Sequence, residues 1–134
     1  KFALKNNLKV VFCIGENKHE KKNQKTLSVL KSQLTKVLEN KFNKNNIIIA
    51  YEPIWSIGTG KLPTAQELQK TTVHIKKVLK NIFKKSSPAV LYGGSVDGNN
   101  VEMFKQIKEI DGFLIGGASK SSKKFIDIIK NYYR

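Results

Sequence analysis

The sequence has few of the residues on which secreted and membrane proteins depend. It contains one cysteine, Cys13, so it forms no intramolecular disulfide, which is typical of a reducing compartment. Its longest uninterrupted apolar runs, 10–14 and 47–51, are five residues each, far short of a membrane span. No apolar segment followed by a small-residue cleavage site opens the chain. We therefore expect a soluble, cytoplasmic protein with no membrane partner.

Methionine is as scarce as cysteine. The only one is Met103, and the chain begins at Lys1. Because translation starts at methionine, we expect either that processing removed it or that these 134 residues are the later part of a longer protein. The fold argument below favours the second explanation.

Positive charge is plentiful but widely distributed. Lys and Arg number 25 against 10 Asp and Glu, a net charge of +15, yet only Arg134 is an arginine. Nucleic-acid recognition favours the planar guanidinium group and a clustered basic surface, whereas these lysines occur in every segment. We expect no nucleic-acid partner, only solvated helix faces whose positive field speeds encounter with small anions.

Four short apolar runs alternate with segments of helical periodicity. We expect strands at 8–14, 47–51, 89–92 and 112–115. We expect helices at 22–42, 100–108 and 121–133. A further helix should begin at a capping box formed by residues Thr64 to Glu67 and end before Ser86. Four βα units with no linker predict one α/β domain over 1–134 with a parallel sheet. Both an open doubly wound sheet and half of a (β/α)₈ barrel of about 250 residues fit this pattern.

Glycine pairs follow two of the expected strands, at the carboxyl ends where both architectures bind ligands. Gly93 and Gly94 precede Ser95, while Gly116 and Gly117 precede the last helix. Glycine lets backbone amides approach an anion closely, and a helix N-terminus adds a favourable dipole. The pattern fits a bound phosphate, although glycine pairs also occur in tight turns that bind nothing.

Glu52 directly follows the apolar strand 47–51. Partial removal of water from a carboxylate favours its protonated form, which suits a general base that takes a proton from carbon. The alternative is a structural carboxylate paired with a neighbouring lysine.

The 11-residue loop 53–63 is bounded by two prolines and carries apolar side chains that need packing partners. It is therefore either a lid that closes over a ligand or a static loop packed on the rim of the fold.

The remaining reactive side chains do not form a recognisable metal or nucleotide site. His19 and His74 lie in separate segments, and Cys13 lies inside an expected strand, where we expect it to pack in the core. The sequence has no Walker loop and no Gly-x-Gly-x-x-Gly after a strand. We therefore expect no metal and no cofactor.

Taken together, four motifs resemble one family. The segment AYEPIWSIGTGK at 50–61 resembles the catalytic strand and lid of triosephosphate isomerases. CIGE at 13–16 resembles the end of the fifth strand of that family, and YGGSV at 92–96 and DGFLIGGAS at 111–119 resemble the seventh and eighth. The resemblance implies that 1–134 is the C-terminal half of a TIM barrel, strands five to eight, with the N-terminal half absent.

The resemblance also implies an activity and the residues that perform it. The activity is interconversion of dihydroxyacetone phosphate and glyceraldehyde 3-phosphate through an enediolate, in glycolysis and gluconeogenesis, by a protein that is usually a homodimer. Glu52 would be the general base, while Gly58, Ser95, Gly116 and Gly117 would offer backbone amides to the substrate phosphate. Trp55 would lie at the first hinge of the lid, with Glu16 as its partner in the open state.

Two departures from the family pattern matter. Pro63 has no amide N–H at the second hinge, where many members offer one to the tyrosine equivalent to Tyr92. The Asn-x-Lys and the His that bind and polarise the substrate belong to the first half of the barrel. We therefore expect this chain alone to be inactive as an isomerase. The alternative is a stand-alone half-barrel that binds phosphate or a partner, with Glu52 idle.

Overall fold

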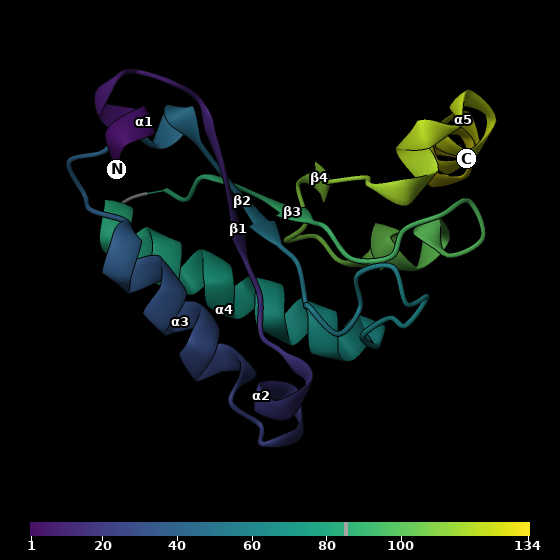
Figure 1. Ribbon diagram of the computed structural model, residues 1–134, viewed down its shortest axis with the longest axis horizontal. Helices are drawn as coiled ribbons and strands as arrows, with labels where there is room; N and C mark the ends of the chain where they lie inside the picture. Colours follow the sequence, from purple (N-terminus) through teal and green to yellow (C-terminus); the bar gives the residue numbers. More distant parts are fainter. Residues whose placement is uncertain (85) are drawn as a thin grey trace.

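The computed structural model of the protein describes residues 1–84 and 86–134, and its centre is one parallel sheet. The strands lie in sequence order, as Figure 1 shows: β1 (Val10–Ile14), β2 (Ile47–Tyr51), β3 (Ala89–Tyr92) and β4 (Gly112–Phe113). In a doubly wound sheet the order of the strands reverses at a switch point. In a barrel each new strand lies beside the one before it in the sequence. The observed order is therefore that of half of a (β/α)₈ barrel.

The connecting helices complete the four βα units. In chain order they are α1 (Phe2–Lys5), α2 (Lys18–Lys22), α3 (Thr26–Val37), the 3₁₀ helix η1 (Lys44–Asn46), α4 (Ala65–Phe83), the 3₁₀ helices η2 (Val101–Gln106) and η3 (Gly117–Lys120), and α5 (Ser122–Tyr133). The capping box expected at the start of α4 is present, with Thr64 and Glu67 exchanging side-chain and backbone hydrogen bonds. Among the described residues, no helix is both long and apolar enough to cross a membrane.

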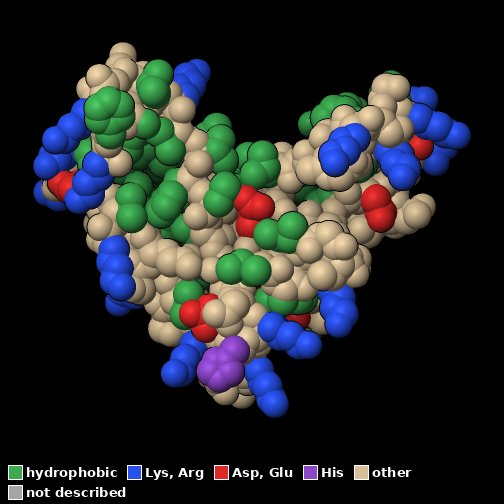
Figure 2. Space-filling model, in the orientation of Figure 1, with side chains coloured by type: hydrophobic (Ala, Val, Ile, Leu, Met, Phe, Trp, Pro, Cys, Tyr) green, Lys and Arg blue, Asp and Glu red, His purple; other side chains and the backbone are tan. Residues whose placement is uncertain are grey.

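The hydrophobic core lies between the sheet and the helices that cover one of its faces. Its fully buried side chains include Ile49, Val90, Leu30, Leu34, Leu68, Ile75 and Leu79 from β2, β3, α3 and α4, and Val101 from η2. The other face of the sheet, which would line the interior of a closed barrel, is not covered by any helix of residues 1–84 and 86–134. Along β1 every second side chain is exposed, and Val11 is 46% exposed. Figure 2 shows hydrophobic side chains along the hollow between the two raised ends of the molecule.

Four details differ from the sequence-based expectations. The helix expected at 22–42 is shorter, since α3 runs from Thr26 to Val37. A separate helix that was not expected, α2, precedes it and ends before Gln24, whose φ is 56°. The strand expected at 112–115 has two residues, and the helix expected at 100–108 is the 3₁₀ helix η2. Cys13 was expected in the core but is exposed, because it points to the uncovered face of the sheet.

The exposed position of Cys13 gives a test of the open face. Burial, and then the hydrogen bond and negative charge of Glu52, raise the pKa of the Cys13 thiol to about 11. Because the thiolate is the reacting form, we expect a small disulfide reagent to modify the native 134-residue chain slowly, about tenfold faster per pH unit from 8 to 10. The measurement is absorbance of the released thiolate, with Cys13→Ser as the blank. A thiol that reacts only after denaturation would contradict an open inner face.

Candidate active site

The carboxyl ends of the strands meet around one cavity of about 560 Å³. All the residues proposed from the sequence line it: Glu52, Gly58, Ser95, Gly116 and Gly117. They come from the segments after β2, β3 and β4, so the parallel sheet brings together residues that are up to 65 positions apart (117 − 52). Neither His19 nor His74 is among the lining residues.

Glu52 is half-buried at the end of β2. A Cβ atom on Gly93 would lie 2.5 Å from the Glu52 Cγ, so the carboxylate occupies space that glycine leaves free. The carboxylate also lies close enough to the Cys13 thiol to raise the pKa of that thiol. Within the described part of the chain, no lysine or arginine nitrogen lies within 4.0 Å of it. The lysine pair considered as the alternative is therefore not what these residues form, and the carboxylate faces the cavity.

Several backbone N–H groups in the cavity wall have no acceptor among residues 1–84 and 86–134. They include those of the four residues proposed from the sequence, Gly58, Ser95, Gly116 and Gly117, and also those of Ile57, Gly94, Val96 and Ile115. Gly58 has a φ of +66°, a conformation that side chains disfavour, and this places glycine at the turn of the lid segment. Unpaired amides that converge on one space are the donor set that an anion such as phosphate accepts from.

The loop 53–63 is internally hydrogen-bonded rather than extended. The buried Ser56 hydroxyl donates to the Lys61 carbonyl at 2.6 Å and so joins the two ends of the loop. The Ser95 hydroxyl accepts from the Gly60 amide at 3.3 Å and donates to the Ser56 carbonyl at 2.7 Å. The loop is therefore a compact body, and among the described residues it is attached to the β3 side of the cavity through Ser95 and the Tyr92 hydroxyl.

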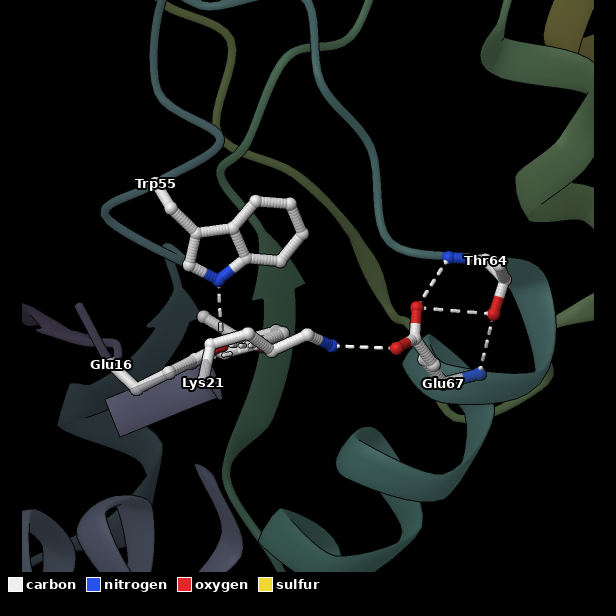
Figure 3. Close-up of polar contacts among 6 residues, drawn as sticks. Glu16, Lys21, Trp55, Thr64 and Glu67 are labelled. Carbon is white, nitrogen blue, oxygen red and sulfur yellow. Dashed lines mark hydrogen bonds and ion pairs between the residues drawn. The ribbon is translucent and has the colours of Figure 1, made fainter. Parts of the chain in front are cut away.

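A buried carboxylate anchors the first end of this loop. Glu16 is 0% exposed and accepts from Trp55 Nε1 at 2.8 Å and from the Tyr51 hydroxyl at 3.2 Å (Figure 3 shows the Trp55 bond). Burial, and then the charge of Glu16, raise the pKa of Tyr51, so this hydroxyl remains a donor. The contact between Trp55 and Glu16 is the one the sequence motifs suggested.

At the second end, Pro63 offers no amide, and the Tyr92 hydroxyl lies 3.3 Å from the Ser56 hydroxyl. Sequence reasoning missed Ser56, which occupies the middle of the lid motif. It also missed Lys124, on the first turn of α5, which lines the cavity. Ser56 lies within the lid motif and Lys124 in no motif, and the contacts of both are tertiary, which the motif alone does not reveal.

The fold and the position of the cavity define half of a (β/α)₈ barrel with the ligand site of that class. The sequence profile of the triosephosphate isomerase family matches residues 1–132, and the chain belongs to this family. It is 45% identical over 133 residues to the triosephosphate isomerase of Yarrowia lipolytica, which covers 98% of this chain and 53% of that protein.

Two further relatives show a similar identity and a similar coverage. The triosephosphate isomerase of Saccharomyces cerevisiae is 42% identical over 134 residues, covering 98% of this chain and 54% of that protein. That of Mycoplasma mobile is 42% identical over 128 residues, covering 96% and 51%. The chain spans about half the length of the curated relatives it matches.

The close approach of Gly93 to Glu52 predicts a difference between two glycine variants. Gly93→Ala places a methyl group 2.5 Å from the Glu52 Cγ and displaces the side chain, so we expect the free energy of unfolding to fall by about 1–3 kcal/mol. Moving Glu52 away should also lower the pKa of Cys13. Gly117→Ala is the control, since nothing lies within 4 Å of its added Cβ, and it should change stability by less than about 0.5 kcal/mol. Urea unfolding that gives equal losses for both would contradict this packing.

Proposed function

We propose that this chain supplies the general base and the phosphate-binding amides of a triosephosphate isomerase, which interconverts dihydroxyacetone phosphate and glyceraldehyde 3-phosphate. One observation carries the proposal: the Glu52 carboxylate and the unpaired amides of Gly58, Ser95, Gly116 and Gly117 line the same cavity. Glu52 takes a proton from one carbon of the substrate and returns it to the adjacent carbon, through an enediolate.

The division of labour follows from the geometry of the cavity. The backbone amides hold the phosphate dianion without a counter-charge of their own, and the loop 53–63 covers it when closed. Removal of water strengthens each of these interactions and protects the enediolate from side reactions. Neither proton transfer nor phosphate binding requires an electron acceptor, so the proposed reaction needs no cofactor.

The same proposal assigns a partner for the open half-barrel. Four further βα units would pair with the free edges of β1 and β4 and cover the exposed inner face around Val11. We propose that these units are the N-terminal half of the barrel and supply the Asn-x-Lys and His of the family. The complete protein would act as a homodimer in the cytoplasm. Loss of one oxyanion donor alone costs about 2.7–4 kcal/mol of transition-state stabilisation, so the isolated chain should be inactive.

The test is reconstitution of activity. We expect the purified chain alone to give no turnover, and a mixture with the separately expressed first four βα units of a homologous triosephosphate isomerase to convert glyceraldehyde 3-phosphate in a coupled assay. In the mixture, Glu52→Gln should lower kcat about 10²–10⁴-fold because the base is lost. Glu102→Gln is the control, since Glu102 is exposed and its only described ion pair is with Lys105 on the same helix.

Three outcomes would contradict the proposal in different ways. Turnover by the isolated chain at enzyme-like rates would show that no further half is needed. Full activity of Glu52→Gln would show that another group is the base. A stable complex that binds inorganic phosphate but never isomerises would favour a phosphate- or partner-binding half-barrel.

A further inference from the structure

Lys21 contacts Trp55, near the start of the loop 53–63, and Glu67, in the first turn of the helix that follows the loop. Its ammonium group lies 2.7 Å from the Glu67 Oε1 and 5.2 Å from the centroid of the Trp55 ring. Figure 3 shows Lys21 between these two partners, which come from different parts of the chain. No sequence motif predicts this arrangement, since Lys21 and Glu67 are 46 residues apart.

Glu67 is tied to the second end of the loop through the start of α4. Its Oε2 accepts from the Thr64 amide at 2.9 Å, and its own amide donates to the Thr64 hydroxyl at 3.2 Å. Thr64 directly follows Pro63, the last residue of the loop. One carboxylate therefore uses one oxygen for the helix cap and the other for Lys21.

Trp55 is tied to the first end of the loop, and its indole has two charged neighbours. The ring nitrogen donates to Glu16 at 2.8 Å, and Lys21 lies over the ring itself. A cation over the face of an indole is attracted by the negative charge of that face. Lys21 also belongs to α2, a helix that begins just beyond Glu16 with its own capping box between Asn17 and Glu20.

We propose that Lys21 is a positioning residue for the lid, which couples its two hinges by pairing with Glu67 and contacting Trp55 at the same time. Because a single ammonium group makes both contacts, a movement at one hinge weakens the contact at the other. This proposal rests on the proposed function, because it takes the loop 53–63 to be the lid of that active site. Its readouts are conformational and need no turnover, so the two proposals fail separately.

The expected size of the effect is modest. The side chains of Lys21 and Glu67 are 32% and 47% exposed, and ion pairs of this kind shift an equilibrium by about two- to fivefold. The relevant equilibrium is detachment of the lid from Ser95, which frees the Gly60 amide from its hydrogen bond to the Ser95 hydroxyl.

The test is amide hydrogen exchange by NMR on the 134-residue chain. We expect Lys21→Gln and Glu67→Gln each to speed exchange of the Gly60 amide about two- to fivefold, with Lys21→Arg close to the wild-type rate. Lys22→Gln removes the same charge from the next position of α2, and among the described residues Lys22 has no carboxylate partner, so it is the matched control. The double variant Lys21→Gln/Glu67→Gln should exchange no faster than the faster single variant.

Two further readouts separate positioning from a general loss of structure. Trp55 is the only tryptophan, so its emission and its quenching by neutral acrylamide report on the first hinge alone, and both should change in Lys21→Gln and Glu67→Gln. The Leu68 amide, which donates to Thr64 in the first turn of α4, should keep its wild-type exchange rate, because the glutamine carbonyl still accepts from Thr64.

Equal effects of Lys21→Gln and Lys22→Gln would overturn the proposal, as would additive effects in the double variant. If Lys21→Gln lowers protection from hydrogen exchange throughout the chain, that variant is destabilised as a whole. The effect of Glu67→Gln on the Gly60 amide then tests the same ion pair from its other side.

Discussion

Three backbone hydrogen bonds just beyond the strands align the carboxyl ends of the four strands with one another. The Glu52 amide donates to the Ile14 carbonyl at 2.7 Å, the Gly93 amide to Tyr51 at 2.9 Å and the Leu114 amide to Tyr92 at 2.9 Å. Each bond continues the parallel ladder by one residue past the last paired position. Because of this register, the segments that leave the strands emerge around a single cavity, and every contact of the candidate site follows from that alignment.

The residues at and just beyond the strand ends pack so closely that three glycine positions have no room for a side chain. A Cβ atom on Gly15 would lie 1.8 Å from the Glu52 carbonyl oxygen, one on Gly93 would lie 2.5 Å from the Glu52 side chain, and one on Gly94 would lie 2.1 Å from the Tyr92 hydroxyl oxygen. These glycines are required by close approach rather than by an unusual φ. The next residue after Gly15 is the buried Glu16, whose carboxylate fixes Trp55 and through it the first end of the lid. The glycines and the lid are thus consequences of one packing constraint.

The sequence predicted what depends on local chemistry. The bounds of β2 and β3 and the capping box at Thr64 are confirmed, because apolar runs and cap residues act within a few positions. The short helix α2 was missed, although the capping-box pattern of Asn17 and Glu20 was present to signal its start. The exposure of Cys13 was not predictable, because it depends on what covers the inner face. The roles of the five site residues stay predictions, while their common cavity is observed.

The central claim is that the unpaired amides around Glu52 form a phosphate site. The most direct measurement is a titration of the isotopically labelled chain with inorganic phosphate, followed by amide NMR. The account predicts that the amide signals of Gly58, Ser95, Gly116 and Gly117 shift together and saturate at one dissociation constant. Shifts that are spread over the lysine-rich helices and grow without saturation would contradict it, because they would show that phosphate responds only to the net positive charge.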